Sequence, residues 1–324
     1  MKIALRIEAS TFRGTRLGVP RLVETLKARE AGATFLFSLG PDHSGRALTR
    51  MLRPGFIGRV RGTSVLRHHG IKALFYGTLL PAPDIGRECA TVMREARDAG
   101  FEIGIHAWDR MAWHEKAAQA DAAWTLAQMT LARERFEEIF EQPARVHGAA
   151  GWQMNRHAYR LTQRLGFSFG SDTRGSGPFV PVFQAEIVAC PQVPTTLPTF
   201  HELRATDGVT THNLVERMLA LTQEAAPSGH VFTLHAEVAG MRFADAFGRL
   251  LDGWHAQGHE MVSLSDYLDA QAVGDLPRHE VSPGEDAGIP GAPARQGREF
   301  LAYASPPSSP SPLRADTLVV EAPV

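Results

Sequence analysis

The sequence predicts a single parallel (β/α) barrel followed by a tail. A strand, a helix and a second strand follow one another within about the first 40 residues, which is the order typical of parallel βαβ units. Four apolar, strand-like runs also stop at a polar side chain, namely Glu8, His106, Asp172 and His235. Because the strand ends of such barrels meet on one face, these side chains predict one polar mouth.

The N-terminal elements follow from local residue patterns. Residues 2–8 are predicted to form the first strand, and a turn at 14–18 leads to a helix with Pro20 in its first turn. Apolar residues then recur at helical spacing until Gly32 ends the helix. Residues 34–39 are an apolar second strand.

The rest of the chain alternates in the same way. Strands are predicted at 101–106, 145–149, 167–171, 231–235 and 260–263, and helices at 85–99, 116–140, 155–165, 213–225, 241–257 and from Ser265. Prolines between 178 and 198 predict a long irregular loop, interrupted by residues 185–190.

The composition changes near residue 274. Nine of the 21 prolines lie beyond this point, together with Ser, Gly and Ala. Such a segment has too few apolar residues to form a core. We therefore expect residues 1–273 to form the barrel and residues 274–324 to be a disordered tail.

Charge and cysteine content narrow the class of protein. The net charge of -1 and the charged fraction of 21% argue against nucleic-acid binding without a local basic patch. Two cysteines, Cys89 and Cys190, cannot form a disulfide framework and favour a reducing compartment. The N-terminus enters a strand directly rather than resembling a signal peptide, and no apolar run reaches the roughly 20 residues of a membrane span. We expect a cytoplasmic protein.

Residues 46–80 interleave basic and apolar side chains in an irregular pattern. One interpretation is a surface that meets anionic lipid head groups. The other is a surface insertion with solvated arginines. Nucleic-acid binding is a weaker third hypothesis, because the segment offers no aromatic stacking platform.

Seven short motifs, in order, resemble one family. They are residues 6–21, 40–42, 105–109, 149–152, 171–175, 194–198 and 234–240. The chain is similar over about residues 1–272 to the 4-deoxy-4-formamido-L-arabinose-phosphoundecaprenol deformylases, of the polysaccharide deacetylase (NodB-homology) superfamily.

This resemblance implies a distorted (β/α)7 barrel and an amidohydrolase. The expected reaction removes an N-formyl or N-acetyl group from an amino sugar linked to undecaprenyl phosphate, for lipid A modification and resistance to cationic peptides such as polymyxin. Peripheral contact with the cytoplasmic face of the inner membrane is expected with such a substrate. In the family, one Asp and two His hold a zinc-like divalent metal, a second Asp acts as base and a late His as acid.

The carry-over of these roles is incomplete. Glu8 stands at the base position, His235 at the general-acid position and His106 at the first metal-histidine position. Ser10 and Arg110 occupy the other two metal-ligand positions. Neither is expected to bind, because a hydroxyl is a poor substitute for a carboxylate and a guanidinium has no lone pair to offer.

Two functions therefore stay open. The chain is either an active amidohydrolase or a metal-free pseudoenzyme that binds the lipid-linked sugar or a partner of the pathway. Arg110 likewise has two interpretations. It acts as an electrophilic clamp opposite Glu8, or it forms a salt bridge with Glu8 that fills an emptied site.

Four further residues are candidates for substrate binding. Arg13 and Arg174 suit a phosphate, and Trp108 suits stacking on a sugar ring, although tryptophan is more often a core residue. Asp172 could orient His235 or bind sugar hydroxyls, or it could cap a turn.

Overall fold

A computed structural model describes residues 1–46, 76–77, 80–271, 276–284 and 292–301 of the chain. The basic and apolar segment predicted at 46–80 lies outside the described residues except at its ends. No helix in the described ranges is long and apolar enough to cross a membrane.

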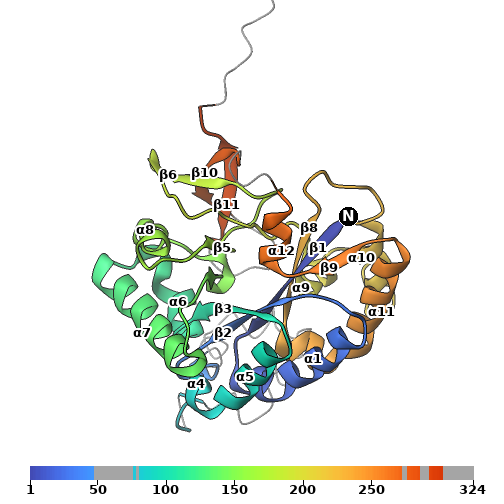
Figure 1. Ribbon diagram of the computed structural model, residues 1–324, viewed down its shortest axis with the longest axis horizontal. Helices are drawn as coiled ribbons and strands as arrows, with labels where there is room; N and C mark the ends of the chain where they lie inside the picture. Colours follow the sequence, from blue (N-terminus) through green and yellow to red (C-terminus); the bar gives the residue numbers. More distant parts are fainter. Residues whose placement is uncertain (47–75, 78–79, 272–275, 285–291, 302–324) are drawn as a thin grey trace, which may run out of the picture.

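A curled sheet of parallel strands forms the centre of the molecule (Figure 1). Its order is β5-β4-β3-β2-β1-β8, and β9 pairs with the first residues of β1. The strands are β1 (Lys2–Ala9), β2 (Thr34–Ser38), β3 (Glu102–Ala107), β4 (Val146–His147), β5 (Phe169–Gly170), β8 (His230–His235) and β9 (Glu260–Val262). The predicted strands and the distorted parallel barrel are confirmed.

The proline-rich loop connects the two edges of this sheet. On one side Val193 N donates to Gly170 O at 2.7 Å, next to β5. On the other side Thr196 N and Leu197 N both donate to Val231 O of β8 at 3.1 Å. The stretch predicted to be irregular therefore fills the gap between β5 and β8, and this explains why the barrel is distorted.

Helices surround the sheet, with α1, α5, α7 and α11 on its outer side (Figure 1). The helices are α1 (Val19–Lys27), α4 (Ile85–Glu88), α5 (Ala90–Asp98), α6 (Arg110–Lys116), α7 (Ala122–Phe140), α8 (Arg156–Arg164), α9 (Phe200–Arg204), α10 (Leu214–Ala220), α11 (Ala244–Ala256) and α12 (Leu264–Asp269). Shorter helical turns are η1 (Gly14–Gly18), η3 (Ala117–Gln119), η4 (Ala150–Trp152) and η5 (Val238–Arg242).

The helix predicted at 116–140 begins later, as α7 at Ala122, and a separate helix, α6, precedes it. Asp109 caps α6 by accepting from Ala112 N, and Asp121 caps α7 by accepting from Trp124 N. Each cap satisfies a backbone N–H that a helix start leaves unpaired, so two helices begin where the apolar pattern suggested one.

The alternation of side chains along β1 decides what faces the barrel interior. Ile3, Leu5 and Ile7 belong to the large cluster shared with the helices. Ala4 belongs to a second cluster, with Leu36, Val146, Phe169 and Val231 from the other strands. Since successive side chains of a strand point to opposite faces, Arg6 and Glu8 lie in step with Ala4 and face the interior.

The tail contains structure that its composition did not indicate. Strands β10 (Arg278–Pro283) and β11 (Ala294–Glu299) form a hairpin, and β10 pairs with β6 (Val180–Phe183), which pairs with β7 (Glu186–Ile187). The prediction of a disordered tail from residue 274 is therefore wrong for these strands. Val281 is only 8% exposed and joins the main core, which ties the hairpin to the barrel.

Candidate active site

Polar side chains meet at the carboxyl ends of three strands. Glu8 lies near the end of β1, directly opposite His235 of β8 in the strand register. His106 lies near the end of β3. The sequence prediction that these ends form one polar mouth agrees with this arrangement.

Glu8 is the centre of the cluster. Its side chain is buried, Oε1 accepts from Arg6 Nη1, and Oε2 lies 3.0 Å from His235 Nδ1. Burial opposes ionisation of the carboxyl group, but the interactions with His106, Arg6 and His235 together outweigh burial and hold the pKa of Glu8 well below its usual range. Glu8 is therefore a carboxylate with both oxygens engaged.

His235 combines a fixed nitrogen with an open one. Its side chain is 35% exposed, whereas its carboxylate partner Glu8 is 4% exposed. Burial works to lower the pKa of His235, but the Glu8 carboxylate outweighs it, and the net effect is a raised pKa. Because Nδ1 donates to Glu8, Nε2 is the nitrogen left to exchange protons at the mouth.

His106 is held in one tautomer. Its Nδ1 lies 2.8 Å from Gly148 O and must donate to that carbonyl, which leaves a lone pair on Nε2. His106 Nε2 lies 3.7 Å from Glu8 Oε2 and has no hydrogen-bond partner among the described residues. Burial lowers the pKa of His106 to about 3, so the ring is neutral above that value.

Arg6 is a part of the site to which the sequence analysis assigned no role. It is completely buried, two residues before Glu8 on the same face of β1. Its guanidinium carbon lies 5.5 Å from the ring centroid of Trp152, and a side chain on Gly148 would collide with Leu36 and press on the Arg6 guanidinium. The period-two alternation of β1 was the signal that would have identified Arg6.

Ser10 is engaged with a second carboxylate. Its Oγ donates to Glu237 Oε1 at 3.1 Å, and both residues are buried. Glu237 Oε2 has no partner among the described residues and points towards Gly14, where a built Cβ would come within 2.7 Å of it. Glu237 is thus another contributor that the sequence analysis did not single out.

Arg110 does not pair with Glu8. The carboxylate takes its guanidinium partner from Arg6, whereas Arg110 Nη2 donates to Ser44 Oγ at a long 3.4 Å. The hypothesis of a Glu8–Arg110 salt bridge is therefore wrong. The reason is that Arg6 is two residues away on the same strand face and reaches Glu8 first. The positive charge of Arg110 still helps to lower the pKa of His106.

The donor set does not fit the divalent metal that the resemblance implies. Of the three implied ligands, His106 keeps a free lone pair, Ser10 gives its proton to Glu237, and Arg110 brings a positive charge. Among the described residues, no group of three or more His, Cys, Asp or Glu side chains is arranged to hold a metal ion. A zinc-like site normally needs three such protein ligands.

The carboxylate of Asp172 is surrounded by hydrogen-bond donors of the protein. It is fully buried and takes part in hydrogen bonds with His147 Nδ1 at 2.7 Å, Ala149 N at 2.8 Å and Gln192 Nε2 at 3.0 Å. The prediction that Asp172 orients His235 or binds sugar hydroxyls is corrected, because its oxygens are used by protein donors and the histidine it holds is His147.

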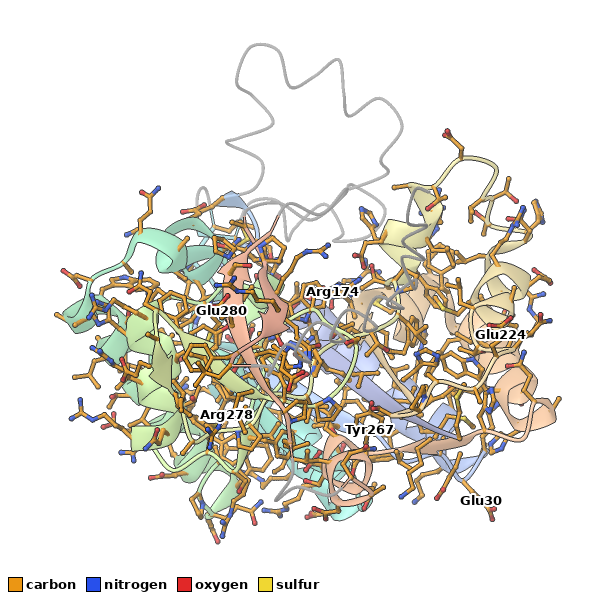
Figure 2. All side chains as sticks on the ribbon, turned by 90° about the horizontal axis from the view of Figure 1, so that it is seen from above. Glu30, Arg174, Glu224, Tyr267, Arg278 and Glu280 are labelled. Carbon is orange, nitrogen blue, oxygen red and sulfur yellow. The ribbon has the colours of Figure 1, made fainter. Side chains whose placement is uncertain are left out.

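The three other residues predicted to contact substrate lie on different segments of the chain. Arg174 ion-pairs with Glu202 at 3.1 Å and lies 5.0 Å from the Trp152 ring, beside the β10–β11 hairpin in Figure 2. Trp108 is half-buried and packs against Gly40 and Arg135. Arg13 is half-buried just before η1. Their roles in binding stay predictions.

The geometry is that of a histidine–carboxylate pair. A buried carboxylate fixes one imidazole nitrogen and leaves the other exposed, which is the arrangement used for general acid–base catalysis. The Arg6 guanidinium holds the carboxylate from the opposite side. Such a set of groups is able to move protons in the hydrolysis of an amide.

Two named relatives match most of this chain. A relative from Shewanella sediminis, named a probable 4-deoxy-4-formamido-L-arabinose-phosphoundecaprenol deformylase ArnD, is 34% identical over 281 residues, covering 86% of this chain and 90% of its own. A relative of the same name from Wigglesworthia glossinidia brevipalpis is 29% identical over 282 residues, covering 85% of this chain and 97% of its own. No protein-family model matches the chain.

A solved structure shares the fold. It is assigned to the polysaccharide deacetylases of Mycobacterium smegmatis, and it has a TM-score of 0.59 and 15% sequence identity. The alignment covers 88% of this chain and 95% of that one.

Proposed function

The chain belongs to the 4-deoxy-4-formamido-L-arabinose-phosphoundecaprenol deformylase family, and we propose that it hydrolyses the N-formyl group of an amino sugar linked to undecaprenyl phosphate. The names of its relatives support this substrate class. The reaction yields formate and the free amino sugar, which carries the positive charge used in lipid A modification.

The observation that carries the proposal is the Glu8–His235 pair. The 3.0 Å contact between Glu8 Oε2 and His235 Nδ1 joins the two positions to which the resemblance gives proton-transfer roles. The substituted Glu8 and the retained His235 thus form a pair suited to acid–base chemistry, in which Glu8 holds the imidazole that moves the proton.

Hydrolysis proceeds in two proton transfers at His235. Water attacks the formyl carbon, a C–O bond forms, and its proton moves to His235 Nε2. The C–N bond of the tetrahedral intermediate then breaks, and the same proton passes to the departing nitrogen. Formate and amine leave, and His235 returns to its neutral form.

Glu8 has a different role from the one that the motif position implies. Its oxygens are engaged by Arg6 and His235, and its pKa is held low, so it is a weak proton acceptor. We assign Glu8 to orienting the imidazole and stabilising the imidazolium that forms during the reaction. His235 is the catalytic acid and base.

A pseudoenzyme that only binds the lipid-linked sugar is not favoured. The buried carboxylate of Glu8 is aligned with a half-open imidazole, an arrangement suited to proton transfer rather than to binding alone. Burying the charged Glu8 is costly unless its partners are retained, and here both partners are present.

The substrate also suggests where the protein acts. A polyprenyl chain stays in the bilayer, so we propose a cytoplasmic protein with peripheral contact at the inner membrane. Arg13 and Arg174 are proposed to meet the substrate phosphate, and Trp108 the sugar ring. Because Arg174 is paired with Glu202, it would have to exchange this partner for the phosphate.

The proposed function is tested with the full-length protein and a short-chain polyprenyl phosphate that carries the formamido sugar. Formate release is measured by a coupled assay and loss of the formyl group by mass spectrometry. The acetamido analogue is assayed in parallel, and it distinguishes a deformylase from a deacetylase. Absence of formate and acetate with both substrates would remove the proposal.

A further inference from the structure

We propose that this site works without a resident divalent cation, and that the buried guanidinium of Arg6 is the permanent counter-charge that holds Glu8 in place for His235. The catalytic part of this inference rests on the proposed function. The part that concerns metal content does not.

The two substituted positions oppose metal binding for separate reasons. Ser10 is a neutral hydroxyl whose hydrogen bond is directed to Glu237 Oε1 at 3.1 Å. Arg110 begins α6 and brings a fixed charge that acts on both His106 and His235. At these two positions, a cation at the mouth would find only the weak hydroxyl ligand of Ser10 and would be repelled by the positive charge of Arg110.

The donors left near the mouth are His106, Glu8 and the unpartnered Oε2 of Glu237, but no three such side chains of the described residues are grouped to hold a metal ion. His106 Nε2 has a free lone pair and Glu8 Oε2 lies 3.7 Å from it. That same oxygen accepts from His235 Nδ1, and the other oxygen of Glu8 accepts from Arg6. A metal ion would have to displace at least one of these charged hydrogen bonds to reach the carboxylate.

Arg6 is built into the barrel as a cation. It has no solvent exposure, and its Nε and Nη2 have no hydrogen-bond partner among the described residues. The guanidinium carbon lies 5.5 Å from the ring centroid of Trp152. The guanidinium also occupies space that is open because Gly148 has no side chain. Arg6 Nη1 donates to Glu8 Oε1, so the positive charge of Arg6 is paired with that carboxylate.

Arg6 is therefore a positioning residue that acts through Glu8 on His235. Its guanidinium places a positive charge directly beside the carboxylate. It keeps Glu8 ionised and fixed, and Glu8 in turn fixes the imidazole. A resident metal ion is not required for this arrangement of charges.

Elemental analysis tests the metal part directly. The full-length protein is purified from zinc-supplemented medium, gel-filtered and analysed beside the double variant Ser10→Asp/Arg110→His. We expect far less than one zinc per native chain and about one per chain of the variant. One firmly bound zinc per native chain would overturn the inference. A double variant that also stays empty would overturn the role given to Ser10 and Arg110.

Two Arg6 variants test the positioning part. Arg6→Gln is expected to lower kcat by about 10²-fold or more with little change in KM, because general acid–base catalysis contributes about that much. Arg6→Lys, which keeps the charge, should recover part of the loss. Equal damage to both variants would contradict a role for charge.

Arg135→Gln is the matched control. Arg135 is also a buried arginine, 8% exposed, and it pairs with Asp84 and Glu138 rather than with Glu8 or His235. Because its guanidinium lies over Trp108, an effect on sugar binding would appear in KM and not in kcat. Its substitution should lower thermal stability while kcat of the folded protein is unchanged. A similar fall in kcat for Arg135→Gln and Arg6→Gln would mean that Arg6 has only a structural role.

The two proposals fail in different ways. If the protein releases neither formate nor acetate, the proposed function fails, but the zinc content still decides the metal part of the inference. If the protein is active and contains one zinc per chain, the inference fails and the proposed function stands.

Discussion

At the scale of single residues, the candidate site consists of three charged or titratable side chains in successive contact. Arg6 contacts Glu8, Glu8 contacts His235, and the exposure of the side chains rises from 0% to 4% to 35% along this series. Arg6 and Glu8 are thus held inside the barrel, and only His235 reaches the solvent. This gradient is the reason that we propose His235, rather than Glu8, as the group that exchanges protons.

The first prediction concerns His235. His235→Asn should reduce formate release by about 10²–10⁴-fold, since a positioned acid–base group contributes that much. The same substitution at the exposed His212 serves as a control and should have no effect. Comparable activity of the two variants in the formate assay would show that His235 does not carry the proton.

At the scale of elements, the carboxyl ends of β4 and β5 are joined by a second buried pair. Asp172 follows β5 and holds His147 of β4 and the backbone of Ala149. This pairing supports the segment that leads into η4 and Trp152. Burial alone would raise the pKa of Asp172, but His147 and the hydrogen bonds outweigh burial and lower it.

The second prediction concerns the pH dependence of stability at Asp172. A lowered native pKa means that ionised Asp172 stabilises the fold above the unfolded-state pKa of about 3.9, and that this contribution is lost as pH falls through the native value. Asp172→Asn should therefore cost about 2 kcal/mol near pH 7, because its amide would face Gln192 Nε2 donor to donor.

The difference between native protein and Asp172→Asn should shrink as the pH falls below about 4. Urea unfolding at a series of pH values measures it. The exposed Asp207→Asn is the control and should leave the free energy of unfolding unchanged throughout. A difference that stays constant with pH would contradict the ionised state of Asp172.

The third prediction concerns the β10–β11 hairpin. Val281 is buried, whereas Ser282, the next residue on β10, is exposed. Val281→Asp should lower the melting temperature by several degrees, since it removes a buried side chain worth about 2 kcal/mol and adds a charge. Ser282→Asp should change little. Equal melting curves for the two variants would mean that the hairpin does not pack on the barrel.

At the scale of the whole molecule, the sequence predicted the parallel strands and the polar mouth because both depend on local patterns. Apolar runs that stop at Glu8, His106 and His235 are visible without a structure. The contact between Glu8 and Arg6 was not predicted, although both residues lie on β1. Their common face follows only when the side-chain alternation of that strand is traced.

Two other features depend on contacts between distant parts of the chain. Residues 191–197 close the barrel by hydrogen bonds to β5 and β8, and β10 pairs with β6 about a hundred residues earlier. Both segments contain prolines, so composition indicated loop or disorder. These segments are ordered by pairing with residues that are distant in the sequence, and such pairing cannot be predicted from a local pattern.

The central claim is that Arg6, Glu8 and His235 support hydrolysis without a resident metal. It is tested most directly by measuring formate release before and after the full-length protein is treated with a chelator and freed of it. The account predicts the same rate in both samples. Loss of activity after treatment, with recovery on addition of zinc, would contradict it.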